Sequence, residues 1–202
     1  MKQRAAIRVK KLSGQILERD LVNTLDRILS PYFEIQHDAV FLGQSIPLVA
    51  RSHLAVQHYT FSKKLVVEKS FLSDVLVFWI EDQPPADDWF AERFAWLRNL
   101  LRQTVPRQQN HFRSRYVGVV LSPVLPDPPV QRRIRRFHHF RWHRFGFEGM
   151  SETFLLAYAW RTDTWCGNRR GREFAPLFTI LNRELLKNGK LSEEGSACLD
   201  SC

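Results

Sequence analysis

Long apolar runs are missing from this sequence. The two longest, VLVFWI (75–80) and FLLAYAW (154–160), are far too short to span a bilayer. The basic first eleven residues are followed by no apolar segment of the kind that a secretory signal requires. These absences predict a cytoplasmic protein with no transmembrane segment.

Cysteine is also scarce. The three cysteines are Cys166, Cys198 and Cys202, and the last two lie in a Ser/Gly/Glu-rich tail. An odd count in this arrangement is no disulfide framework. Cys166 lies close to Arg169 and Arg170, which could activate its thiol, but nothing local identifies a base for it. We therefore expect an inert thiol.

No complete catalytic or metal-binding motif is present. His138, His139 and His143 include a pair four residues apart, but no Glu lies between them as in a zinc-protease helix, and the neighbouring arginines would repel a cation. The turn CGNRRGRE (166–173) lacks the Gly-Lys-Ser/Thr ending of a P-loop. The sequence therefore predicts no catalytic residue, no metal site and no cofactor, and favours a protein that is not an enzyme.

Hydrophobic residues make up 44% of the 202 residues, enough for one folded domain. Apolar periodicity and the positions of proline and glycine predict helices over 15–30, 89–105 and 173–187, and strands over 33–42, 53–61, 64–71, 74–80, 115–121 and 153–160. A tight reversal is expected at Ser62–Lys63. We expect a single α+β domain with a mixed β-sheet packed by about three to four helices and a basic helix–strand insertion. This domain should cover residues 13–190, between a basic flexible leader (1–12) and a disordered tail (191–202).

The order of helix, three strands, helix and strand over residues 15–121 resembles the core order of PD-(D/E)xK nucleases. That resemblance implies a metal-binding acid followed by a Glu/Asp-x-Lys motif, for which the candidates are Glu18, Glu68, Lys69 and Asp74. However, Glu68 and Lys69 are adjacent and should point to opposite faces of a strand. No lysine follows Asp74 at the required spacing. A metal-dependent nuclease of degenerate PD-(D/E)xK type is therefore an alternative interpretation.

Acidic residues are few in one segment of the chain. Residues 107–172 contain thirteen arginines, four acids and no lysine. Within them, RRIRRFHHFRWHR (132–144) contains no acid at all. The spacing of Val130, Ile134 and Phe137 after two prolines predicts a short helix, and the alternation that follows predicts a strand.

The arginines of this segment cannot all point into the core, because a buried unpaired guanidinium is costly. They are solvated, paired with the protein's own acids, or paired with an anionic partner, since runs of charge are commonly solvated faces. We favour an accessory protein that binds nucleic acid, with RNA or single-stranded DNA preferred, because Arg suits phosphate and exposed rings can stack on bases. The alternative is an acidic protein partner, with the chain acting as an interaction subunit of a larger assembly. The oligomeric state is left open. The candidate nucleic-acid-binding residues are Arg132, Arg133, Arg135, Arg136, Phe140, Arg141, Trp142, His143 and Arg144, together with Arg169, Arg170 and Arg172 before the last helix.

Overall fold

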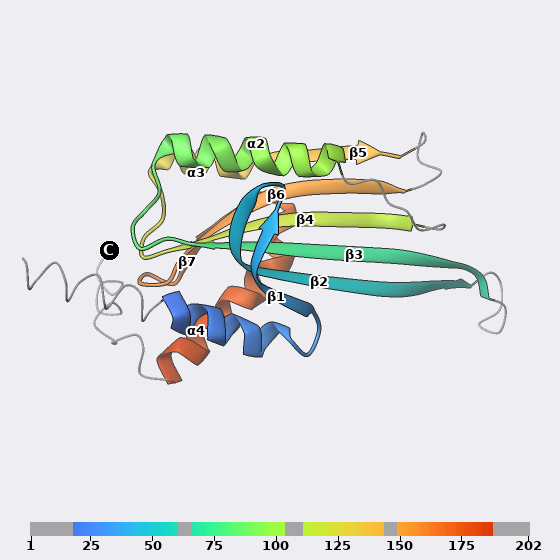
Figure 1. The fold of residues 1–202 in the computed structure, drawn as a ribbon, viewed down its shortest axis with the longest axis horizontal. Coiled ribbons are helices and arrows are strands. Elements are labelled where there is room, and N and C mark those ends of the chain that lie inside the picture. The colour runs from blue at the N-terminus through green and yellow to red at the C-terminus, as the bar shows by residue number, and fades with distance from the viewer. Residues whose placement is uncertain (1–17, 60–65, 104–110, 144–148, 188–202) are drawn as a thin grey trace, which may run out of the picture.

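A computed structural model describes residues 18–59, 66–103, 111–143 and 149–187. In these residues, seven strands form one mixed sheet with helices on both faces, an α+β fold in a single domain (Figure 1). The strands are β1 (Glu34–Phe41), β2 (Gln44–Tyr59), β3 (Val66–Ile80), β4 (His111–Ser122), β5 (His138–Trp142), β6 (Met150–Ala159) and β7 (Thr164–Cys166). The helices are an N-terminal helix over 18–29, α2 (Asp87–Gln103), α3 (Pro128–Arg136), the short 3₁₀ helix η2 (Arg170–Phe174) and α4 (Ala175–Lys187).

The order of the strands is β1-β2-β3-β4-β6-β5, and β7 also pairs with β6. β1, β2 and β3 are joined antiparallel, whereas β3, β4 and β6 run parallel to one another. The parallel connections contain α2 and α3, as parallel strands require. β5 and β7 are both antiparallel to β6, and they pair with its first and second halves respectively.

The two faces of the sheet carry separate apolar clusters. α2 and α3 cover one face, called here the α2 face, where Phe90, Leu97 and Ile134 pack on alternate residues of the strands. The N-terminal helix and α4 cover the other, the α4 face, through Leu25 and Phe178 among others. In Figure 1 these two pairs of helices lie on opposite sides of the sheet. Three layers of this kind bury the central strands on both faces, which explains their continuous apolar runs.

Several predicted elements are confirmed. The strand over 33–42 is β1, the helix over 89–105 is α2 within the described residues, and the last helix is α4. The basic segment does pass from a short helix into a strand, as α3 and β5, and α3 has proline at its first positions. Neither β7 nor η2 was predicted. The leader, the tail and the expected reversal at Ser62–Lys63 lie outside the described residues.

Two strand boundaries were predicted wrongly. β2 begins at Gln44 rather than at residue 53, and its ladder with β1 passes over Pro47 and Asp38 without pairing them. Asp38 has a positive φ of 47° at this interruption, which accommodates a proline that has no N–H to donate. The second error concerns β3, which is one continuous strand where the sequence predicted two, over 64–71 and 74–80. The residues between the two predicted strands, 72 and 73, pair with β2 and β4 in the same ladders as their neighbours.

Candidate nucleic-acid interface

The basic segment forms one edge of the sheet. Val130 and Ile134 of α3 are buried against the α2 face, and the four arginines of this helix, Arg132, Arg133, Arg135 and Arg136, are exposed. β5 follows directly and is the last strand at this end of the sheet. The apolar residues of α3 therefore face the core, and its arginines face the solvent.

One of the four arginines on α3 has an acidic partner in the described structure. Arg133 forms an ion pair with Asp87 at the start of α2, and its guanidinium lies 5.3 Å from the centre of the Phe94 ring. Arg135 donates a hydrogen bond to Gln131 Oε1, 3.3 Å away. Arg132 and Arg136 form no ion pair with any residue that the structure describes. Most of the positive charge on α3 is thus not neutralised by the fold around it.

β5 presents different side chains to the two faces of the sheet. Arg141 lies on the α2 face and donates a hydrogen bond to the carbonyl oxygen of Arg102, 2.6 Å away, near the end of α2. Phe140 and Trp142 pair with Glu152 and Met150 of β6 and therefore share the α4 face with them. Their side chains are 58% and 56% exposed. The arginines of α3 and these two aromatic rings consequently flank the edge from opposite sides.

Three rings form a ladder along this strand. His138, Phe140 and Trp142 occupy alternate positions on the α4 face, and the ring centres are 6.1 Å apart for the first pair and 6.3 Å for the second. The aromatic ladder, as we call these three residues, is a surface on which planar groups can stack.

The remaining candidates of this segment do not join that surface in the described structure. His143 is buried, and its Nε2 lies 2.8 Å from Ser151 Oγ. Arg144 lies outside the described residues. The contact surface of the segment thus consists of α3 and β5 up to Trp142.

The second basic element meets the first at the same edge. Cys166 Sγ lies 3.5 Å from the carbonyl oxygen of Gln131 on α3, and Asn168 Nδ2 donates a hydrogen bond to the carbonyl of Phe137, 3.2 Å away. Arg169, Arg170 and Arg172 follow immediately, and all three are exposed. They too form no ion pair within the part of the chain that the structure describes. The structure therefore brings together two groups of arginines that are more than thirty residues apart in the sequence.

The glycines of this turn are required by packing. A Cβ atom on Gly167 or Gly171 would come within 2.4 or 2.3 Å of Leu156 Cδ2. The amide of Gly171 is already bound by Asn168, through the side-chain Oδ1 at 2.8 Å and the backbone oxygen at 3.1 Å. Glycines at the start of a helix can let an anion approach free backbone amides. The amide of Gly171 is not free for this purpose, so the arginine side chains remain as the basic groups of this turn.

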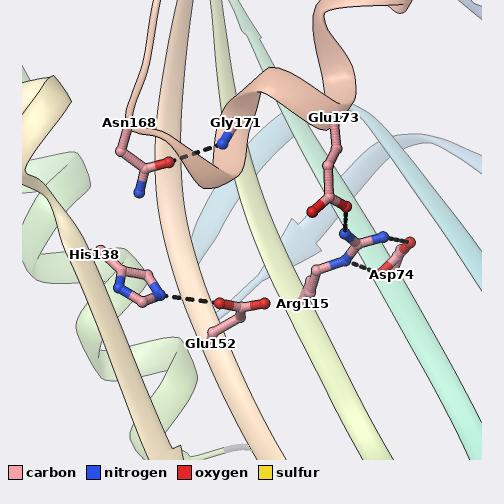
Figure 2. A network of polar contacts seen from close by, with 7 residues as sticks. All are labelled: Asp74, Arg115, His138, Glu152, Asn168, Gly171 and Glu173. Carbon is pink, nitrogen blue, oxygen red and sulfur yellow. Dashed lines mark hydrogen bonds and ion pairs between the residues drawn. The ribbon is translucent and has the colours of Figure 1, made fainter.

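A row of polar residues crosses the α4 face beside this edge (Figure 2). Asp74 of β3 pairs in register with Arg115 of β4, Arg115 with Glu152 of β6, and Glu152 with Phe140 of β5. Arg115 Nε donates to Asp74 Oδ1 at 2.6 Å, and its Nη1 binds Glu173 at the end of η2. Burial acts to lower the pKa of Arg115, but the hydrogen bonds and charges of Asp74 and Glu173 outweigh it and hold that pKa above the usual value. Arg115 therefore connects η2 to the sheet by binding Glu173 and Asp74 at the same time.

Glu152 is the most deeply buried acid of this row. Its side chain is 1% exposed, and its Oε2 lies 2.9 Å from His138 Nε2. Its other oxygen, Oε1, has no hydrogen-bond partner among the described residues. Neither Glu152 nor Arg115 was predicted from the sequence as a site residue. The available signal was a charged residue at the start of an otherwise apolar strand.

The residues suggested by the nuclease resemblance do not assemble into a metal site in the described structure. No group of three or more His, Cys, Asp or Glu residues that could hold a metal occurs there. The carboxylate of Asp74 is occupied by Arg115, and the side chains of Glu68 and Lys69 are outside the description. Burial raises the pKa of the Cys166 thiol despite the nearby charge of Arg135, so this cysteine is not activated.

No helix in the described residues is long and apolar enough to cross a membrane. None of the curated proteins and none of the solved structures matches the chain. One family model does match, over residues 18–180, which includes every described strand and the first part of α4. The chain therefore belongs to the family described as "Domain of unknown function (DUF8052)".

Proposed function

We propose that this protein is a non-enzymatic, cytoplasmic accessory protein that binds nucleic acid along the sheet edge built from α3, β5 and η2. The observation that carries the proposal is the concentration, at this edge, of exposed arginines that form no ion pair with an acid among the described residues. The six arginines concerned are Arg132, Arg135 and Arg136 on α3, and Arg169, Arg170 and Arg172 at η2. We call them the arginine edge.

The arginine edge supplies contacts of the kind that phosphates require. Guanidinium groups bind phosphate oxygens through paired N–H donors, and release of counterions from the nucleic acid adds to the affinity. Contacts of this kind fix the position of a strand and carry no sequence information. Because α3 and η2 flank the same edge, a strand that runs along β5 can meet both.

The aromatic ladder favours a single strand over a duplex. Its rings occupy alternate positions of a β-strand, and neighbouring ring centres lie 6.1 and 6.3 Å apart. Stacked bases in a duplex repeat every ~3.4 Å along each strand. A base can rest on each ring only when the strand is unstacked, which single-stranded RNA or DNA allows and a duplex does not.

An acidic protein segment is the second candidate, and the same arginines are its only support. Exposed aromatics and arginines also characterise protein interfaces, where the chain would act as a subunit of a larger assembly. A carboxylate-bearing chain, however, gains nothing from the stacking surface of His138, Phe140 and Trp142. The ladder therefore makes nucleic acid the better candidate.

The proposal is tested by titrating the protein with fluorescent single-stranded and duplex oligonucleotides at several salt concentrations. If about five phosphates are contacted, log K should fall against log salt with a slope of roughly −3.5 for single strands and −4.5 for duplex. Binding should weaken and the slope flatten in the double variant Arg132→Glu/Arg136→Glu. Neither residue has a partner in the described fold, so the thermal midpoint should hardly change.

The matched control is Arg19→Glu/Arg183→Glu, which changes the net charge equally at exposed positions on the N-terminal helix and α4. That variant should bind much as the wild type does. The proposal fails if the wild type does not bind at low salt, or if both charge reversals weaken binding equally. Equal binding of polyglutamate, in competition with the oligonucleotide, would favour the acidic protein partner instead.

A further inference from the structure

Glu152 is a buried carboxylate with half of its hydrogen-bonding capacity unused. His138 binds Oε2, while Oε1 has no partner within the described structure. An unpaired buried carboxylate oxygen destabilises the fold, because it has lost its hydrogen bonds to water and the protein provides none in their place. Because Glu152 lies on β6, one strand from the edge of the sheet, a ligand bound at that edge could donate the missing hydrogen bond.

The surroundings of Glu152 indicate where that ligand would come from. Its cross-strand neighbour on β5 is Phe140, and its bonded partner His138 is 31% exposed, so the carboxylate lies just below the aromatic ladder. The one arginine beside it in register, Arg115, is already occupied by Asp74 and Glu173 (Figure 2). The protein thus supplies no cation of its own to Oε1 from the described strands.

We propose that Glu152 is a base-reading residue, whose Oε1 accepts hydrogen bonds from the Watson–Crick edge of a guanine stacked on the aromatic ladder. This inference rests on the proposed nucleic-acid binding and adds a base preference to it. Phe140 and Trp142, which are more than half exposed, shift to admit the base, since no further described strand pairs with β5 on its outer side.

Guanine is the base that suits a carboxylate oxygen best. Its N1–H and N2–H₂ groups are adjacent donors with no acceptor between them. Cytosine and adenine each offer one amino donor beside a ring-nitrogen lone pair, and the N3–H of uracil or thymine lies between two carbonyls. A carboxylate repels those lone pairs, whereas it meets only donors at this part of the guanine edge.

A second unsatisfied group on the same face complements guanine further. Arg113, two residues before Arg115 on β4, pairs in register with Met150, the residue opposite Trp142. Its Nε is buried without a hydrogen-bond partner in the described part of the chain. Guanine O6 is an acceptor that arginine donors commonly bind.

The experiment uses the full chain and oligothymidine 12-mers that carry one central guanine, inosine, adenine or cytosine in place of a thymine. A single guanine avoids self-association of guanine-rich strands. The wild type should bind the guanine oligonucleotide about tenfold more tightly than the all-thymine strand, the difference that one well-placed base contact gives. Inosine, which lacks the N2 amino group, should lose part of that preference.

Glu152→Gln is the diagnostic variant, because it keeps the shape of the side chain and removes the carboxylate. It should bind all the oligonucleotides within about twofold of one another, with the salt dependence of the wild type. If Glu152 were only structural, this variant would shift the thermal midpoint and leave the guanine preference intact, and the inference would fail. Should the variant not fold, the affinities of the wild type for the guanine, inosine and all-thymine strands still show whether the protein reads the donor groups of guanine.

The outcomes separate this inference from the proposed function. Equal binding of all the 12-mers by the wild type would disprove base reading and leave nucleic-acid binding standing. No binding of any 12-mer at low salt would remove both. A preference for adenine or cytosine over guanine would contradict the chemistry assigned here to Glu152.

Discussion

Asn168 donates a hydrogen bond from Nδ2 to the backbone carbonyl of Phe137, and it thereby connects two pieces of chain that both border β6. Phe137 lies between α3 and β5, whereas Asn168 lies between β7 and η2. The same amide side chain accepts a hydrogen bond from Gly171 N through its Oδ1. One buried residue thus sets the position of η2, and with it three arginines, relative to the edge strand.

The first prediction concerns this connection. Asn168→Ala removes both side-chain hydrogen bonds. The carbonyl of Phe137 loses this donor, and the Gly171 amide keeps only its bond to the backbone oxygen of residue 168, so the free energy of unfolding should fall by about 1–3 kcal/mol. Urea denaturation measures this loss. Asn99→Ala, which removes a hydrogen bond between exposed side chains on α2, is the control and should cost well under 1 kcal/mol. A loss no larger than that of the control would show that Asn168 does not hold the edge together.

The second prediction compares two ion pairs that differ in burial. The side chains of Arg115 and Asp74 are 12% and 14% exposed, whereas Arg133 and Asp87 are largely in solvent. Arg115→Leu leaves one largely buried carboxylate unpaired and releases Glu173, so it should destabilise the protein by roughly 3 kcal/mol. Arg133→Leu should cost about 1 kcal/mol or less. Equal losses in the two variants, measured by urea denaturation, would mean that the polar row on the α4 face contributes nothing special to stability.

Much of the fold follows from local pattern, whereas the site depends on long-range pairing. The passage from α3 to β5 could be predicted because Val130, Ile134 and Phe137 repeat at helical spacing before Phe140 and Trp142 alternate. The contact between His138 and Glu152 could not, because it requires β5 to lie antiparallel to β6 in one register. A slip of one residue in that register would turn His138 to the opposite face.

The same distinction explains the errors in the strands. Residues 44–52, which include Pro47, were not assigned to a strand, yet most of them pair with β1 in a ladder that passes over Pro47 at Asp38. The two strands predicted over 64–71 and 74–80 form one strand, because β2 and β4 pair with it across the predicted gap. Both ladders join residues far apart in the sequence, and no periodicity in a single segment can reveal them.

The third prediction concerns pH and rests on Tyr158, a phenol buried on the α4 face. Burial and the hydrogen bond to Asp163, 2.9 Å away, raise its pKa well above the ordinary value near 10. The folded state therefore keeps this proton at a pH where the unfolded chain loses it. Stability from this group is complete below pH ~10 and is lost as the pH rises further, at up to about 1.4 kcal/mol per pH unit.

Urea denaturation between pH 8 and pH 11 tests this effect, with Tyr158→Phe as the comparison. The variant loses the hydrogen bond at every pH but no longer has a phenol to ionise, so its stability should decline less steeply above pH 10. If stability fell equally steeply with pH in the two proteins, groups other than Tyr158 would account for the loss of stability above pH ~10. Tyr32, an exposed phenol, provides Tyr32→Phe as a control that should leave the curve unchanged.

The last prediction concerns the aromatic ladder. Phe140→Ala and Trp142→Ala each remove a ring that is more than half exposed and lies on an edge strand, so neither should change the free energy of unfolding by more than about 0.5 kcal/mol. Each should weaken single-strand binding by about 1–3 kcal/mol, the usual contribution of one base stacked on one ring. The slope of log K against log salt should stay at its wild-type value, because no charge has been removed.

Tyr32→Ala removes an even more exposed aromatic side chain away from this edge and should leave binding unchanged. Duplex affinity should fall much less than single-strand affinity, since bases that stay stacked in a duplex cannot each rest on rings whose centres lie 6.1 and 6.3 Å apart. If instead the two ladder variants weakened duplex and single strands alike, the rings would be serving as general contact surface, and the preference for unstacked bases would have to be abandoned.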